Sequence, residues 1–297
     1  MLGVVNLDKP VGPTSHDMVG MMRRLTGTRR IGHAGTLDPL ASGVLPILVG
    51  SATRFSAELT GGFKRYDAVI RLGARSTTDD AQGPIEIGDG PIPDEAAVRT
   101  ALASFVGTFD QLPPAFSARK VGGRTAHRAA RAGEPLVLPP RSVTIEAVEL
   151  LAYDRADDRA DLRVDLRCGA GTYVRSLARD LGERLGCGGY LLTLRRTEAA
   201  GLSVETAFTP ERLEGLAGDG RLGDAILPVG ELLPLPHVIL DADAAEAFRN
   251  GSARTLGDHP AADGRAAVFA AGELIGIGSV TANLLQPEKV LPREAAG

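Results

Sequence analysis

Asp38 is the one acidic residue in the stretch GHAGTLDPLASG, residues 32–43, which otherwise holds glycines, other small residues, aliphatics, a histidine and a proline. An aspartate ahead of a proline often caps a turn by accepting backbone N–H bonds. A carboxylate fixed in a rigid loop can also attack a sugar carbon or stabilise positive charge on it. From this loop alone, a turn cap and a reactive group are equally good interpretations.

Several other kinds of site are excluded by spacing. The five histidines have no close mutual spacing and no nearby cysteine pair, so we expect no metal site. The glycine-rich stretches lack the lysine of a phosphate-binding P-loop, and no G-x-S-x-G or G-x-G-x-x-G motif stands between a strand and a helix. We therefore expect neither a nucleotide cofactor nor a hydrolase triad.

The composition is that of an ordinary globular protein, with 297 residues, 43% hydrophobic residues and a net charge of −4. The length allows one large core or a large domain with a small appendix. Cys168 and Cys187 are too few for a disulfide scaffold, and no basic and apolar leader precedes MLGVVNLDKP, which favours a reducing cytoplasm. The most apolar stretch, GVLPILVG, is far shorter than the roughly 20 residues of a membrane span.

Positive charge is concentrated in two segments. Residues 1–75 hold ten Lys/Arg against five acids, and residues 115–135 hold five Lys/Arg against one acid. Solvated helix faces are the ordinary explanation of such clusters. Binding of a nucleic-acid backbone is the other explanation, because its phosphates attract clustered cations even when the net charge of the protein is negative.

The elements that must position Asp38 follow from periodicity. GVVNL predicts a strand, and SHDMVGMMRRLTG predicts a helix that starts at Ser15 and stops at Gly27. After the Asp38 loop, VLPILVG predicts a buried strand and SATRFSAELT a short helix. RYDAVIRLG alternates as a half-buried strand, whose apolar face comprises Tyr66, Ala68, Ile70 and Leu72.

The second half of the chain predicts further strands and helices. Residues 76–93 read as a loop, PDEAAVRTALASFVG as a helix capped at Asp94, and residues 111–133 as a basic insertion with one short helix near its end. VTIEAVELLAY and DLRVDLRC read as strands, and the second leads into the helix TYVRSLARDLGERLG, with Thr172 as its cap. Tyr173 and Arg175 then lie in its first turn, off the apolar stripe. Prolines near VGELLPLPHVIL suggest a boundary, and AVFAAGELIGIGSV suggests a small β module. We expect an α+β fold with a mixed, largely antiparallel sheet flanked by helices.

Four long motifs, in order, resemble the TruB family of tRNA pseudouridine synthases. They are KPVGPTS, GHAGTLDPLASGVLPILVGSATR, KRYDAVIRLG and GAGTYVRSLARDLGERLGCGGYLLTLRRT, and the match spans about residues 2–200. The basic insertion and the form LASGVLPI resemble the bacterial, stand-alone branch. The resemblance implies a catalytic domain over residues 1–230 with an RNA-binding insertion at about 110–140. It also implies a C-terminal PUA-like RNA-binding domain over residues 236–292.

The activity that the resemblance implies is isomerisation of uridine 55 in the T-arm loop of tRNA. The uridine flips out of its loop, its N1–C1′ bond breaks, and the uracil is rejoined through C5 without a cofactor. The implied partner is tRNA, with no membrane and no obligatory protein or guide RNA, and the enzyme would be a monomer. A non-catalytic RNA-binding protein of the same fold is the alternative, and a nucleoside glycosidase is a more distant one.

The resemblance also implies roles for single residues. Asp38 occupies the position of the catalytic aspartate, and Arg175 lies beside it and keeps it ionised and oriented. Tyr66 stacks on the target base and acts near the reacting carbon, Tyr173 and Leu194 line the rest of the pocket, and His33 lies beside the flipped nucleotide. Without the resemblance, we would favour core packing for Tyr66, a loop role for His33 and an exposed position for Arg175.

Two further sets of residues follow from the same resemblance. Lys9 and Pro10 match the first motif of the family, where they would brace the active-site loop. The basic insertion would close over the RNA and bind phosphates rather than read bases. Its candidate phosphate-binding residues are Arg119, Lys120, Arg124 and Arg128.

Overall fold

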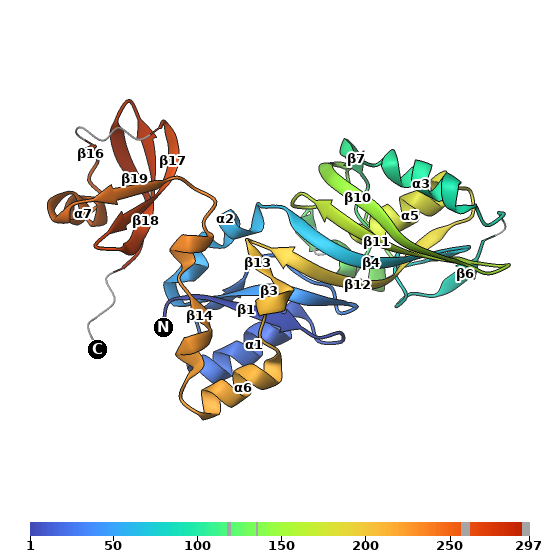
Figure 1. The fold of residues 1–297 in the computed structure, drawn as a ribbon, viewed down its shortest axis with the longest axis horizontal. Helices are drawn as coiled ribbons and strands as arrows, with labels where there is room; N and C mark the ends of the chain where they lie inside the picture. The colour runs from blue at the N-terminus through green and yellow to red at the C-terminus, as the bar shows by residue number, and fades with distance from the viewer. Residues whose placement is uncertain (89, 118–119, 135, 257–261, 293–297) are drawn as a thin grey trace.

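The computed structural model describes residues 1–88, 90–117, 120–134, 136–256 and 262–292. Figure 1 shows an elongated molecule with a small sheet at one end and a large sheet running through the rest. The large sheet has ten strands within these residues, and its main path follows the order β14-β1-β3-β12-β4-β11-β10-β7, with β2 and β13 paired beside it. Its strands are β1 Gly3–Lys9, β2 Ile31–His33, β3 Ala41–Val49, β4 Lys64–Leu72, β7 Gly107–Gln111, β10 Arg141–Arg155, β11 Ala160–Cys168, β12 Gly189–Ala199, β13 Leu202–Ser203 and β14 Ile226–Leu227.

The large sheet is mixed but mostly antiparallel, as predicted. Strands β3 and β12 pair in parallel, and the other pairs of this sheet are antiparallel. The parallel pair sets Leu194 of β12 opposite Ala41 of β3, the strand that begins three residues after Asp38. The Asp38 loop is therefore tied to the middle of the sheet.

The helices cover the two halves of this sheet. Helix α1 and helix α6 lie together at the β1 end, and α3 and α5 lie at the β10 end (Figure 1). One apolar cluster joins both helix pairs to the sheet. The helices are α1 Ser15–Thr26, α2 Ser56–Thr60, α3 Glu95–Ala103, α4 Ala126–Arg131, α5 Val174–Arg184, α6 Pro210–Gly218 and α7 Ala242–Arg249, with 3₁₀ turns η1 Gly50–Phe55, η2 Val204–Thr206, η3 Leu222–Ala225 and η4 Val229–Leu232.

The first helix shows why local sequence predicted its ends. Thr14 caps α1 by accepting from the Asp17 N–H, and the Asp17 carboxylate accepts from the Thr14 N–H in return, which forms a capping box. At the other end Gly27 takes the left-handed conformation, with φ of 67°, in which a helix terminates readily. The predicted cap of α3 at Asp94 is also present.

Four sequence-based assignments are corrected. The stretch read as a loop contains β6 Ile85–Ile87, which pairs with β5 Ala74–Ser76, and β7 was not predicted at all. Both unpredicted strands are short. The residues of β6 are exposed, and β7, GTFDQ, holds a single large apolar residue, so neither shows an apolar alternation in its sequence. The short helix SATRFSAELT is a 3₁₀ turn followed by α2. Thr172 does not cap α5, whose N-cap is Tyr173.

A small β module is present at the C-terminal end, as predicted. Its five strands run in the order β15-β17-β18-β19-β16, with α7 packed against them. They are β15 His237–Leu240, β16 Arg254–Thr255, β17 Gly264–Ala270, β18 Glu273–Thr281 and β19 Leu284–Val290. Buried Glu58 of α2 binds Arg265 of β17 and Lys289 of β19, each at 2.7 Å, and so joins the module to the body of the molecule.

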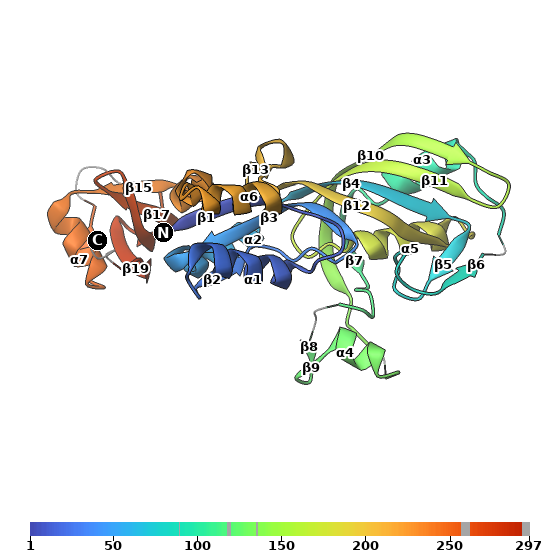
Figure 2. The same cartoon turned by 90° about the horizontal axis from the view of Figure 1, so that it is seen from below.

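The basic insertion forms an arm. Figure 2 shows α4 and the hairpin of β8 Lys120–Val121 and β9 Arg124–Thr125 projecting from the body, with one short helix as predicted. No helix in the described part of the chain is long and apolar enough to cross a membrane.

Candidate active site

The Asp38 loop is held by side chains that come from distant parts of the sequence. Ser15, the first residue of α1, accepts from the Leu37 N–H at 2.8 Å and donates to the Leu37 carbonyl at 3.0 Å. Buried Arg196 of β12 donates to the carbonyls of Gly35 at 3.0 Å and Val44 at 2.7 Å. Both ends of the loop are thus fixed to the sheet, which holds the backbone around Asp38 rigid.

Arg175 contacts the Asp38 carboxylate directly. Its Nε and Nη2 lie 3.0 and 2.9 Å from Oδ2 of Asp38, and its other bonds go to the carbonyls of Thr78 at 3.1 Å and Phe116 at 3.0 Å. The Arg175 side chain is 5% exposed, whereas that of Asp38 is 39% exposed. The buried guanidinium fixes the direction of the carboxylate, while the exposed part of Asp38 can meet a substrate.

The exposed first-turn position favoured for Arg175 from sequence alone is wrong. The N-terminus of α5 points into the molecule, so Arg175 is buried although it lies outside the apolar stripe of its helix. Asp80, also buried, lies 3.6 Å from Nε of Arg175 and accepts from the Thr78 hydroxyl at 2.6 Å. The loop that carries Asp80 was not singled out in the sequence, because a buried carboxylate there leaves no periodic signal.

A cavity of about 240 Å³ opens beside Asp38 and brings together most of the candidate residues. Tyr66 of β4 lies opposite Arg196 of β12, and Leu194 lies opposite the neighbouring Ala68, so these side chains share one face of the sheet. Burial raises the pKa of Tyr66, which keeps its hydroxyl protonated. The cavity is lined by Gly35, Thr36, Leu37, Asp38, Thr60, Lys64, Tyr66, Ser117, Gly169, Gly171, Thr172, Tyr173, Val174, Arg175, Leu194 and Arg196.

Two cations in this wall were missed in the sequence. Lys64 donates to the carbonyls of Thr60 and Gly62, each at 2.6 Å, and burial lowers its pKa to about 8. Alternation along β4 places Lys64 on the same face as Tyr66, and alternation along β12 places Arg196 on that of Leu194. Continuing the apolar alternation by one step in each strand would have indicated both residues.

His33 is not among the residues that line the cavity. It ends β2, is half-buried, and its Nδ1 has no hydrogen-bond partner in the described part of the chain. Burial lowers the pKa of His33, and the nearby Arg196 charge lowers it further, so the neutral ring is favoured. Its contact with a flipped nucleotide stays a prediction.

Lys9 lies at the turn that contacts the Asp38 loop, where the first motif predicts a structural brace. Its side chain is fully buried, and its amine donates to the carbonyls of Pro10 at 2.7 Å and Pro13 at 2.8 Å. Burial lowers the pKa of Lys9 to about 8. These bonds fix the turn before α1, and the Gly12 N–H in this turn donates to the Pro39 carbonyl of the Asp38 loop at 2.8 Å.

The comparison with protein families shows the family of this chain. The N-terminal domain of the TruB family pseudouridylate synthases matches residues 23–174, which is just over half of the chain. The tRNA pseudouridylate synthase B C-terminal domain matches residues 175–234. This chain belongs to the TruB family of pseudouridylate synthases. The family match contains Asp38, Tyr66 and Tyr173 in its first part and Arg175, Leu194 and Arg196 in its second.

Relatives match this TruB-family chain along almost its whole length. The tRNA pseudouridine synthase B of Burkholderia mallei (strain NCTC 10247) is 42% identical over 97% of this chain and 96% of the relative. The enzyme of the same name from Ralstonia pickettii (strain 12J) is 39% identical over 97% of this chain and 94% of the relative. The resemblance of the four motifs to this family is thus confirmed.

Solved structures share the fold of this family member. A Cbf5-Nop10-Gar1 complex contains a chain that is 28% identical, with a TM-score of 0.73, covering 98% of this chain and 86% of that one. An H/ACA RNP bound to a substrate RNA containing 2′-deoxyuridine contains one that is 26% identical, also with a TM-score of 0.73, covering 99% and 86%. The pseudouridine synthase fold is therefore shown for this chain.

The structure of this TruB-family chain describes some of the predicted phosphate-binding residues of the arm. Arg119 lies outside the described residues, and Lys120 begins β8. Arg124 is exposed but pairs with Glu134 at 2.7 Å, and Arg128 is exposed on α4. The root of the arm is bound to the site, because the Phe116 carbonyl accepts from Arg175.

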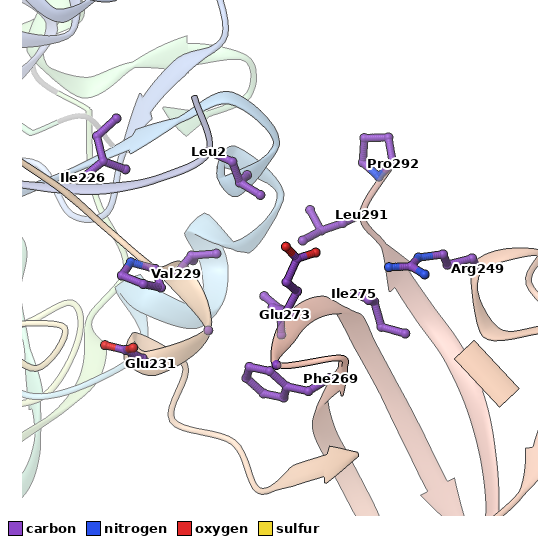
Figure 3. Close-up of a pocket in the computed structure, with 14 residues that line it drawn as sticks. Leu2, Ile226, Val229, Glu231, Arg249, Phe269, Glu273, Ile275, Leu291 and Pro292 are labelled. Carbon is purple, nitrogen blue, oxygen red and sulfur yellow. The ribbon is translucent and has the colours of Figure 1, made fainter. Parts of the chain in front are cut away.

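A larger cavity, of about 700 Å³, lies apart from Asp38. In Figure 3, Leu2, Ile226 and Val229 stand on one side of it, and Phe269 and Leu291 of the C-terminal module stand on the other. None of the candidate site residues lines it. Within the described residues, no group of three His, Cys, Asp or Glu side chains could hold a metal ion.

Proposed function

We propose that this protein is a tRNA pseudouridine synthase that isomerises uridine 55 in the T-arm loop. The observation that carries the proposal is the contact between buried Arg175 and half-exposed Asp38 beside a cavity that Tyr66 and Leu194 line. The name tRNA pseudouridine synthase B, borne by whole-length relatives, supports tRNA as the substrate.

The geometry supports a route that uses this chain's own side chains. The target uridine leaves its loop and enters the cavity, where Tyr66 stacks on the uracil and Leu194 and Tyr173 contact its edges. Asp38 acts at the ribose, the N1–C1′ bond breaks, and the detached uracil turns within the cavity. The C5–C1′ bond then forms, the C5 proton passes to solvent and N1 takes up a proton from solvent, so substrate and product are isomers and no cofactor is consumed.

The rest of the chain supplies RNA binding. The arm closes over the T-arm, and its cations, Arg124 and Arg128 among them, bind phosphates. Residues 1–230 form the catalytic domain and residues 236–292 a PUA-like RNA-binding domain. The enzyme acts in the cytoplasm as a monomer, without a guide RNA or an obligatory protein partner.

Tritium release tests this proposal. A tRNA transcript that carries tritium at C5 of its uridines is incubated with the full chain. Release of one tritium per tRNA supports a synthase that acts on a single uridine. Free uracil would instead indicate a glycosidase, and tight tRNA binding without release would indicate a non-catalytic RNA-binding protein of the same fold.

A further inference from the structure

Phe63 is an exposed aromatic ring at the edge of the site. It precedes Lys64, which lines the Asp38 cavity, and 46% of its surface is exposed. The Arg167 guanidinium lies over the ring, 5.6 Å from its centre, and is itself held by Glu146 at 2.7 Å. The arginine over one face of the ring favours a fixed orientation of the ring.

The ring stands next to the mouth of the cavity. Gly169, which lines the cavity, lies close enough that a methyl group on its Cα would be 4.0 Å from Cε1 of Phe63. Phe63 also lines a second hollow, of about 480 Å³, which shares Lys64 with the Asp38 cavity. Phe63 therefore lies between the Asp38 cavity, which would hold the target uridine, and the second hollow.

Arg141 lies against Gly171, two residues after Gly169 in the same loop. A methyl group on Gly171 would lie 2.3 Å from Cζ of Arg141, so the guanidinium lies directly against the glycine. Gly171 lines the cavity and has a φ of 88°, in the region that favours glycine. Arg141 has no acidic partner in the described part of the chain, so its charge is free to meet a phosphate.

The geometry points to a subsite for the nucleotides that flank the target uridine, formed by Phe63 and Arg141 on either side of the loop Gly169–Gly171. This inference rests on the proposed function, because it requires a single-stranded RNA segment around the flipped base. Phe63 stacks on the base of a neighbouring unpaired nucleotide, and Arg141 binds a phosphate of the same segment. Stacking of this kind tolerates any base, so the subsite adds affinity and not base selection.

The test combines protein variants with altered RNA. Stem-loop RNAs carry C5-tritiated uridine at the target and a single abasic nucleotide on its 5′ or its 3′ side. Wild type, Phe63→Leu, Phe63→Tyr and Arg141→Gln are compared for RNA affinity and for the single-turnover rate at saturating protein. Arg155→Gln is the matched control, since Arg155 is exposed at the opposite end of the same strand, β10.

Phe63→Leu is expected to weaken binding of the intact RNA by about tenfold, while Phe63→Tyr retains wild-type affinity. On the RNA that lacks the stacked base, Phe63→Leu and wild type bind equally. Arg141→Gln is expected to lower the slope of log affinity against log salt by about 0.7, the value for one phosphate contact of a single strand, and Arg155→Gln leaves it unchanged.

The subsite is refuted if Phe63→Leu weakens both abasic RNAs as much as the intact one, or if Arg141→Gln keeps the wild-type salt slope. Absence of tritium release by wild type is a different outcome, since it overturns the proposed function itself. The two failures are distinguishable because affinity and turnover are measured on the same RNAs.

Discussion

At the scale of single residues, the pair Asp38 and Arg175 joins chemistry to structure. A lone aspartate in a loop was equally readable as a turn cap or as a reactive group, and the structure gives it a buried guanidinium as partner. Because the two residues are 137 positions apart in the sequence, hydrophobic periodicity could not predict this contact. The resemblance to a known family was therefore the only sequence argument that brought the two together.

Arg175→Lys is expected to lower the single-turnover rate by about 10²–10³-fold with little change in tRNA affinity. Lysine keeps the charge but not the planar fork that contacts Asp38, Thr78 and Phe116 together. Rapid-quench measurement of tritium release and filter binding check the two quantities. Arg184→Lys, in the last turn of the same helix, is the control, and a rate within threefold of wild type for Arg175→Lys would contradict the positioning role.

Lys64 predicts a dependence of stability on pH. Burial lowers its pKa from 10.5 to about 8, so between these values the unfolded chain holds a proton that the folded protein has released. The free energy of unfolding therefore rises with pH in this window, and the full cost of the buried cation is present below pH 8.

The measurement is urea unfolding of wild type and Lys64→Met from pH 7 to 10.5. The difference in unfolding free energy, wild type minus variant, should increase by about 1 kcal/mol per pH unit above pH 8. Lys9 titrates in both proteins and cancels. A difference that stays flat would mean that Lys64 remains protonated in the folded state.

At the scale of elements, the start of α5 depends on a residue 62 positions away. The Gln111 side chain accepts from the Tyr173 N–H at 2.8 Å and donates to the Tyr173 carbonyl at 3.1 Å. This buried amide holds the backbone of the N-cap residue, whose own side chain makes no capping bond. The end of β7 thereby fixes the helix that carries Arg175.

Gln111→Leu is expected to lower the free energy of unfolding by about 1–3 kcal/mol, because it leaves the Tyr173 N–H buried without its partner. Because α5 carries Arg175, the single-turnover rate should fall as well. Urea unfolding and tritium release measure the two effects. Gln286→Leu, at an exposed position of β19, serves as the control, and a variant as stable as wild type would contradict this account of the helix start.

The elements show what local sequence can and cannot predict. Helix α1 was predicted with both ends because its capping box and its terminal glycine are local signals. The cap of α5 was predicted wrongly, since Thr172 does not cap it and the backbone of its N-cap residue is held by Gln111 of a distant strand. Of the cavity wall, Tyr66 and Leu194 were predicted through the family. Lys64 and Arg196 are in phase with them along their strands but were missed, because Lys and Arg are rarely buried and so are not sought on a buried face.

At the scale of the whole molecule, the C-terminal module shares an apolar cluster with the body. Ala267, Ile277 and Leu291 pack in one cluster with Val4 and Val44 of the large sheet. Glu58 adds ion pairs across the same junction. The module is therefore held in a fixed position relative to the large sheet.

Calorimetry of the full chain is expected to give one cooperative transition, with equal calorimetric and van't Hoff enthalpies, because unfolding of either sheet exposes the shared cluster. Glu58→Ala should lower the midpoint without splitting the transition, since the cluster remains. Two separate transitions in wild type would show that the module and the body unfold independently.

The most direct test of the central claim is to map pseudouridine, nucleotide by nucleotide, in a tRNA transcript incubated with wild type or with Asp38→Asn. The change removes the negative charge and keeps the size of the side chain, so Arg175 stays in place and RNA binding is retained. We predict one pseudouridine, at position 55, with wild type and none with Asp38→Asn. Pseudouridine formed by the variant at a rate near that of wild type, or wild-type modification at another position alone, would contradict the account.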